Sequence, residues 1–139
     1  MEFIRIPRRL INQILDLSQQ SPSNEICGLL SSQNSNDSHE PVNCYPVANA
    51  STEPNHHYLM DPGQQIDAFR KMRERGEELY AIYHSHPQSP AYPSTEDLEK
   101  ISYPEVLHII ISMSTAGTLQ LKGFRVKTGS ITAIDIAVE

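Results

Sequence analysis

Residues 79–97 read LYAIYHSHPQSPAYPSTED and hold the most informative pattern in this chain. The apolar beginning of this stretch, up to Tyr83, is typical of a buried strand. Because side chains alternate along a strand, we expect His84 and His86 on the same face. With Asp97 arriving from a nearby turn, the two imidazoles can supply three ligands to a zinc ion. Three protein ligands and one open position are typical of a catalytic zinc site, so the pattern points to metal-assisted hydrolysis.

Ordinary structural explanations exist for the same residues. A single histidine in a strand is more often a packed or exposed residue than a ligand, and a His-x-His pair alone can be a coincidence. Ser94 and Asp97 form a capping-box-like helix start, in which the helix dipole favours the aspartate. These explanations do not exclude a metal site, because the serine can cap the helix while the aspartate one turn later reaches the ion. Spacing alone therefore leaves both interpretations open.

A hydrolytic zinc site also needs a general base, and Glu25 is the candidate. A carboxylate near the zinc-bound water must take its proton. Glu25 opens the otherwise apolar strand 26–30, and a carboxylate at the edge of a core strand needs a reason. The alternative is a solvated strand terminus, and the sequence by itself does not decide between the two.

The rest of the chain predicts one mixed α/β domain over residues 1–139. Short spacing between the last three strands excludes helical crossovers, so we expect those strands to be antiparallel. The fold class is then a single mixed, largely antiparallel sheet with helices packed against it. The expected elements are strands at 2–6, 25–31, 41–48, 79–83, 105–112, 118–126 and 131–138, helices from Pro7 to about Ser21, from Asp61-Pro62 to Gly76 and from Ser94, and a polar loop at 33–39. Ile66, Phe69 and Met72 are the expected buried stripe of the second helix.

Composition limits the partners and the compartment. Eleven basic and 17 acidic residues give a formal charge of −6, and the lack of a basic stripe argues against nucleic acid. No apolar stretch resembles a signal peptide or reaches the ~20 residues that cross a bilayer, so no membrane partner is expected. Cys27 and Cys44 are the only cysteines and form no Cys-x-x-Cys pair. We therefore expect a cytoplasmic protein with free thiols.

Several other polar residues receive structural interpretations. Cys27 lies on the same side of its strand as Glu25, but a buried structural cysteine is the preferred interpretation. His56 and His57 are expected in a solvated loop, although they could line a substrate groove. His108 is expected to be a core or half-buried histidine, and Asp61 to be a helix cap.

Taken together, Glu25, His84-Ser85-His86-Pro87, Ser94 and Asp97 resemble the signature of the JAMM (MPN+) metallopeptidase family. That signature is an early glutamate, then His-Ser/Thr-His, seven residues, serine, two residues and aspartate. The likeness covers nearly the whole chain and is greatest to the small stand-alone bacterial members. The resemblance implies the MPN/JAMM fold, which is cytidine-deaminase-like.

The resemblance also implies roles for these residues. His84, His86 and Asp97 would bind Zn²⁺, Glu25 would act as the base, and Ser94 would donate a hydrogen bond to the oxyanion. The expected reaction is peptide or isopeptide cleavage after the C-terminal glycine of a ubiquitin-like or sulfur-carrier protein with a Gly-Gly tail. One alternative is a non-catalytic MPN-type scaffold that binds a ubiquitin-like partner. A nucleoside deaminase is disfavoured, because the chain lacks the Pro-Cys-x-x-Cys and His-x-Glu motifs of that class.

Overall fold

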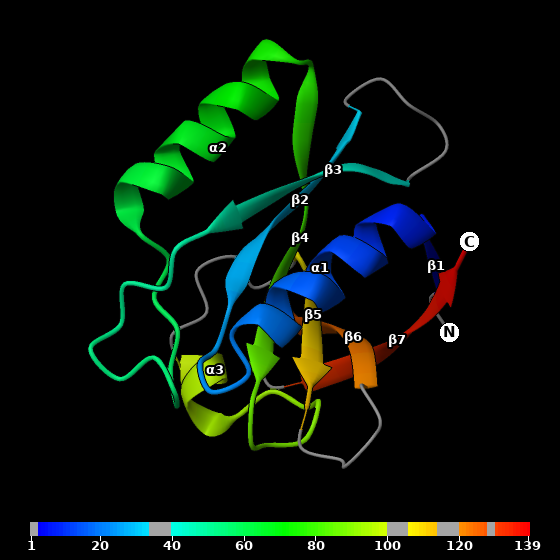
Figure 1. Cartoon of the computed structure of the whole chain (residues 1–139). Helices are drawn as coiled ribbons and strands as arrows, with labels where there is room; N and C mark the ends of the chain where they lie inside the picture. The colour runs from blue at the N-terminus through cyan, green and yellow to red at the C-terminus, as the bar shows by residue number, and fades with distance from the viewer. Residues whose placement is uncertain (1–2, 34–39, 100–105, 114–119, 128–129) are drawn as a thin grey trace.

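The computed structural model describes residues 3–33, 40–99, 106–113, 120–127 and 130–139. Helices and strands follow one another in the order that the sequence predicts (Figure 1). Their bounds are β1 Phe3–Ile6, α1 Arg8–Gln20, β2 Cys27–Gln33, β3 Pro41–Val47, α2 Pro62–Glu74, β4 Glu77–His86, α3 Thr95–Glu99, β5 Leu107–Ser112, β6 Gln120–Lys127 and β7 Ser130–Val138. The polar loop expected at 33–39 lies, apart from Gln33, outside the described residues.

One mixed sheet contains all the described strands, in the order β1-β7-β6-β5-β4-β2-β3. The predicted antiparallel arrangement of the last three strands is confirmed by the β5–β6 and β6–β7 ladders. Two pairs are parallel: β4 with β5 near the centre and β1 with β7 at one edge. The predicted fold class, a largely antiparallel sheet with helices packed against it, is confirmed.

The two long helices pack against different sets of strand side chains. Leu10, Ile11 and Ile14 of α1 join a buried cluster that contains Tyr83 of β4. Ala68 and Met72 of α2 join a second cluster that contains the next residue back, Ile82. Adjacent strand residues point to opposite faces, so the helices cover opposite faces of the sheet. By the same alternation, the even-numbered His84 and His86 share the face of α2.

Helix α2 begins and ends where the sequence predicts, but its buried stripe differs in one residue. Asp61 caps the helix by accepting a 2.9 Å hydrogen bond from the N–H of Gln64, and Gly76 follows the helix with a φ of +69°. Ile66 is 68% exposed, so its predicted burial is wrong. Steps of three residues drift by about 60° each on a helix, which places Ile66 about 120° from Met72. Ala68, one turn before Met72, occupies the buried position instead.

Glu77, the first residue of β4, is a buried carboxylate at the end of the strand opposite to the histidines. Glu77 accepts hydrogen bonds from Ser31 Oγ at 2.8 Å, Tyr45 Oη at 2.6 Å and Asn43 Nδ2 at 2.5 Å. Burial acts to raise the pKa of Glu77, but these three donors and the nearby Arg75 outweigh it and hold the pKa below its usual range. The ionised carboxylate therefore ties the beginning of β4 to β2 and β3.

No helix within the described ranges combines the length and the apolar character that crossing a membrane requires.

Candidate metal centre

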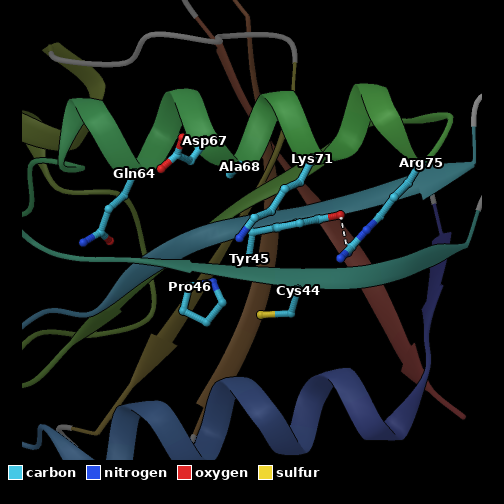
Figure 2. A pocket seen from close by; sticks show the side chains of 8 residues that line it. All are labelled: Cys44, Tyr45, Pro46, Gln64, Asp67, Ala68, Lys71 and Arg75. Atoms are coloured by element: carbon cyan, nitrogen blue, oxygen red, sulfur yellow. Dashed lines mark hydrogen bonds between the residues drawn. The ribbon is translucent and has the colours of Figure 1, made fainter.

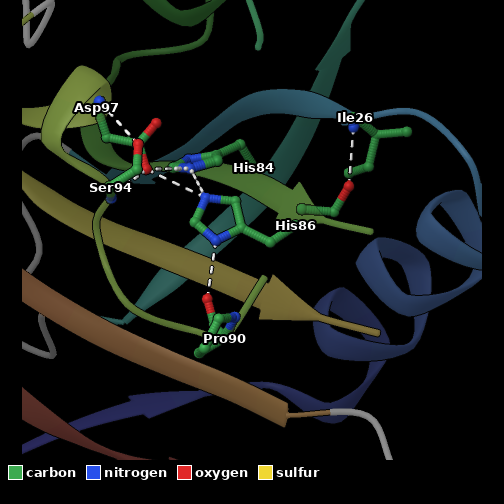
Figure 3. Close-up of polar contacts among 7 residues, drawn as sticks. Ile26, His84, His86, Pro90, Ser94 and Asp97 are labelled. Carbon is green, nitrogen blue, oxygen red and sulfur yellow. Dashed lines mark hydrogen bonds and ion pairs between the residues drawn. The ribbon is translucent and has the colours of Figure 1, made fainter. Parts of the chain in front are cut away.

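The end of β4 and the first turn of α3 bring three predicted ligands together (Figure 3). His84 and His86 are 2% and 3% exposed. Their Nε2 atoms lie 3.1 Å apart, and each lies close to the same oxygen of Asp97, Oδ2, at 3.2 Å from His84 and 3.1 Å from His86. The predicted alternation of β4 and the predicted helix start at Ser94 thus lead to one compact group of donor atoms.

The spacing of these three atoms fits a tetrahedral metal ion. With metal–ligand bonds of about 2.05 Å, the corners of a regular tetrahedron are about 3.3 Å apart. The three observed separations, 3.1 to 3.2 Å, are close to this value. Two imidazole nitrogens and one carboxylate oxygen are also the donor set that zinc prefers at catalytic sites. The residues therefore fit a divalent metal with one coordination position left open.

Hydrogen bonds from the surrounding backbone orient two of the three groups. Nδ1 of His86 lies 2.8 Å from the carbonyl oxygen of Pro90, which favours the tautomer with its proton on Nδ1 and a free lone pair on Nε2. Ser94 and Asp97 bond reciprocally: Ser94 N–H donates to Asp97 Oδ2 at 2.9 Å, and Asp97 N–H donates to Ser94 Oγ at 3.0 Å. The capping interpretation and the ligand interpretation of this pair thus hold together.

Burial and mutual contact shift the pKa values of these groups. Burial lowers the pKa of His84 and outweighs the opposing effect of Asp97. Burial also acts to lower the pKa of His86, but its bonds to Asp97 and to Pro90 O raise the pKa overall. The pKa of Asp97 falls well below its usual range, because hydrogen bonds to the two histidines outweigh its burial. Asp97 is therefore an ionised carboxylate at neutral pH.

Glu25 lies beside this group, just before β2. Strand β2 begins at Cys27, two residues later than the sequence predicts, so Glu25 belongs to the connection that precedes the strand. Glu25 is only 6% exposed, which contradicts a solvated terminus. One donor atom from each of Glu25, His84, His86 and Asp97 can be chosen so that all four lie within 4.8 Å of one another. The carboxylate is therefore close enough to act on a water molecule at the open position of a metal.

The backbone of Glu25 is fixed by the segment 49–59. Its N–H donates to Pro54 O at 2.7 Å, and its carbonyl accepts from Asn49 Nδ2 at 2.9 Å. Ser85, between the two histidines, has the opposite orientation, and its Oγ accepts from Ile26 N–H (Figure 3). These contacts fix the backbone of Glu25 next to the end of β4.

Tyr58 belongs to the site but was not predicted. Its ring stacks on His84 with the centroids 4.4 Å apart and the planes 25° apart. Burial, and next the charge of Asp97, raise the pKa of its phenol above the usual value, so the hydroxyl stays protonated. Tyr58 follows a polar stretch and has no periodic partners, so no local pattern indicates this contact. Only the tertiary fold places the residue over a histidine in β4.

The remaining candidates lie outside the four-residue group. Cys27 is buried, its Sγ lies 3.4 Å from Val47 O, and burial followed by the charge of Glu25 raises its thiol pKa to about 12. It is a structural cysteine, as expected. His56 is exposed, and His57 is half-buried and lies 3.4 Å from the carboxylate of Glu53. His108 is buried, as predicted.

A separate pocket of about 400 Å³ lies between α2 and β3 (Figure 2). Gln64, Lys71 and Arg75 reach into it from the helix, and Arg75 Nη1 donates to Tyr45 Oη at 3.0 Å. None of the four clustered residues lines this pocket. It therefore does not contribute to the candidate metal centre.

The fold thus brings two histidines from β4, an aspartate from α3 and a glutamate from the connection before β2 into one group that fits a metal ion. The sequence model described as prokaryotic homologs of the JAB domain matches residues 7–123. The chain belongs to this family, and the resemblance seen in the sequence is confirmed.

Relatives and solved structures agree with this family. A CysO-cysteine peptidase from Mycobacterium tuberculosis is 28% identical over 88% of this chain and 82% of its own length. A desampylase from Haloferax volcanii is 32% identical over 66% of this chain and 64% of its own length. The solution structure of DSY2949 from Desulfitobacterium hafniense has a TM-score of 0.87 and 30% identity, over 99% of this chain and 93% of that one.

A JAB1/MPN domain protein from Archaeoglobus fulgidus, AF2198, has a similar fold. Its crystal structure has a TM-score of 0.59 at 20% identity and covers 98% of this chain and all of that one.

Proposed function

We propose that this chain is a single-domain zinc peptidase. The observation that carries the proposal is the convergence of four buried or half-buried donor groups, three of them spaced as the corners of a tetrahedron. His84, His86 and Asp97 would hold the zinc ion. When bound, zinc polarises the scissile carbonyl and makes water a stronger nucleophile at neutral pH. The remaining chemistry is carried by the side chains of the chain.

Glu25 is the proposed general base. Its carboxylate takes a proton from the attacking water and later passes that proton to the leaving amine. This role requires a carboxylate beside the metal that is not itself one of the three ligands. Its burial beside the ligand atoms, and the two backbone bonds that fix its position, support this assignment.

Ser94 is the proposed donor to the oxyanion of the tetrahedral intermediate. Its Oγ already accepts the N–H of Asp97 at 3.0 Å, so the hydroxyl hydrogen is available to point elsewhere. A preorganised donor aimed at developing negative charge stabilises the transition state more than the ground state. The exposed position of Ser94, at the start of α3, lets a substrate carbonyl approach it.

The proposed substrate is a ubiquitin-like or sulfur-carrier protein with a Gly-Gly tail, cut after its last glycine. The relative from Mycobacterium tuberculosis is named a CysO-cysteine peptidase. Another relative, from Thermus thermophilus, is 40% identical over 55 residues and is named a probable TtuB-protein conjugate cleaving protease. Both names describe cleavage of a conjugate. Glycine suits such a site, because it has no side chain to block the close approach of the backbone. Free Cys27 and Cys44 support a cytoplasmic setting.

A cleavage assay tests this proposal. The probe is a ubiquitin-like protein that ends in Gly-Gly and is joined through that end to cysteine or to a second protein. The matched probe carries valine in place of the last glycine. We expect cleavage of the glycine probe alone, together with about one zinc per chain by metal analysis in the wild type but not in His84→Ala.

The outcomes separate the competing functions. Binding of the glycine probe without cleavage by the zinc-loaded protein would indicate a scaffold and end the peptidase proposal. Equal cleavage of both probes would remove the substrate assignment and leave a broader peptidase.

A further inference from the structure

The two histidines at the end of β4 are oriented by different means. Nδ1 of His86 lies 2.8 Å from a backbone carbonyl, the usual way in which a ligating imidazole is held. Nδ1 of His84 is buried and has no hydrogen-bond partner among the described residues. A buried ring without such a bond can rotate about its side-chain torsions unless packing prevents it. The plane of His84 therefore depends on its contacts at Nε2 with His86 and Asp97 and on the groups that pack against its ring.

Tyr58 provides a nearly parallel aromatic surface against His84. Its ring and the ring of His84 are 4.4 Å apart at 25°, whereas His84 and His86 are 4.9 Å apart and tilted by 59°. Tyr58 is half-buried and also packs against the apolar cluster beneath α2. A stacked aromatic surface opposes rotation of the imidazole out of its plane.

The backbone around Tyr58 is held on both sides by one side chain. Asn49 Nδ2 donates to the carbonyl of His57 at 2.9 Å, and Asn49 Oδ1 accepts from the N–H of Leu59 at 3.0 Å. The same Nδ2 donates to the carbonyl of Glu25 at 2.9 Å. One amide thus connects the segment that carries the stacked ring with the segment that carries the proposed base.

We propose that Tyr58 is a positioning residue of the metal centre, whose ring fixes the plane of His84 in place of a hydrogen bond to Nδ1. Asn49 holds the backbone on both sides of Tyr58, which keeps the tyrosine ring at stacking distance from the imidazole of His84. The phenol oxygen is not needed for this role, because the contact is between ring faces. The inference rests on the proposed use of His84 as a metal ligand.

Metal affinity is the direct readout. Purified wild type, Tyr58→Phe, Tyr58→Leu and Phe69→Leu are titrated with Zn²⁺ against a competing chelator, and with Co²⁺ while its visible spectrum is recorded. Phe69→Leu is the matched control, because it makes the same aromatic-to-aliphatic change in the same apolar cluster. We expect Tyr58→Leu to bind zinc about tenfold or more weakly, as for other residues that orient a ligand. Tyr58→Phe should retain the affinity and the Co²⁺ spectrum of the wild type.

A measurement on the wild type covers the case in which Tyr58→Leu does not fold. Nuclear Overhauser contacts between the ring protons of Tyr58 and His84 are expected in the zinc-loaded protein, and their absence would overturn the proposal. Wild-type affinity in Tyr58→Leu, or an equal loss in Phe69→Leu, would overturn it as well. In those cases the wild type still binds zinc, so the metal proposal stands. A wild type that binds no zinc contradicts both proposals.

Discussion

The hydroxyl oxygen of Ser85 accepts a 2.8 Å hydrogen bond from the backbone N–H of Ile26, the residue that follows Glu25. The N–H of Ser85 in turn donates to Ile26 O at 3.0 Å. The middle residue of His84-Ser85-His86 thus points away from its neighbours and joins β4 to the connection that carries the proposed base. Together with the β2–β4 ladder, in which Cys27 lies opposite His84, these two bonds help to fix the glutamate relative to the two histidines.

Replacing Ser85 by alanine should destabilise the protein. The change leaves the partly buried N–H of Ile26 without its acceptor, which should cost about 1 kcal/mol, the lower end of the range for a buried donor. Ser18→Ala is the matched control, because Ser18 is also fully buried but only donates to a carbonyl within its own helix, Ile14 O. Urea unfolding should show a larger loss for Ser85→Ala. Equal losses would mean that the bond to Ile26 has no particular importance.

Glu25→Gln should separate proton transfer from metal binding. The amide keeps the size of the side chain but cannot accept the proton, so turnover should fall by about a hundredfold or more. Zinc content should match the wild type, since the three proposed ligands are unchanged. Metal analysis beside the cleavage assay checks both expectations. Loss of zinc would identify Glu25 as a ligand, and unchanged turnover would exclude it as the base.

Ser94→Ala should lower turnover by about a hundredfold, at the lower end of the effect expected for Glu25→Gln, and leave zinc bound. The metal should remain because the bond to Asp97 Oδ2 comes from the backbone N–H of Ser94, which alanine retains. We expect the effect in kcat and little change in KM, as for an interaction made in the transition state. A rise in KM with kcat unchanged would assign Ser94 to substrate binding.

Removing the metal should abolish activity and leave the fold. The larger apolar cluster, which α1 covers, contains none of the four clustered residues. A core of this kind does not depend on an ion, in contrast to a zinc finger. Circular dichroism should change little on adding chelator, although the thermal midpoint should fall as bound metal is lost. Complete unfolding at room temperature would show that the metal has a structural role.

The acid stability of the protein should depend on Glu77. Its pKa in the folded state lies below that of an ordinary glutamate, so the ionised carboxylate stabilises the fold at pH values above the ordinary glutamate pKa. As the pH falls through the lowered folded-state pKa, protonation weakens its three hydrogen bonds and the free energy of unfolding should decrease. Glu77→Gln should be less stable at neutral pH and should lose less stability on acidification. The exposed neighbour provides the control, since Glu78→Gln should follow the wild-type curve.

Local patterns placed His84, His86 and Asp97 near one another, because their arrangement depends on short-range geometry, but spacing alone did not decide whether they bind a metal. Strand alternation was enough to place His84 and His86 together, and the helix-start pattern was enough to locate Asp97 one turn into α3. Glu25 was a candidate because a carboxylate beside an apolar strand needs a reason, but only the family resemblance favoured it over a solvated strand terminus. The structure buries it beside His84, His86 and Asp97.

Contacts between residues far apart in the chain could not be predicted from local sequence patterns. Tyr58 and Asn49 act through contacts across the fold that leave no periodic signal in the sequence. The parallel pairings of β1 with β7 and of β4 with β5 join strands whose partners no local pattern identifies. The burial of Ile66 was predicted wrongly because the spacing Ile66, Phe69, Met72 uses steps of three residues, which drift around a helix with about 3.6 residues per turn.

The pairing of β1 with β7 has a consequence for synthesis. Strand β1 lies at the edge of the sheet, and its described partner is β7, from Phe3 opposite Asp135 to Ile6 opposite Val138. A ribosome makes residues 130–138 more than a hundred residues after β1, so the first strand emerges long before its partner exists. The half of the sheet formed by β2, β3 and β4 has all its strands much earlier. The nascent chain can therefore assemble the strands that carry the candidate metal centre first, and add the β1–β7 edge of the sheet last.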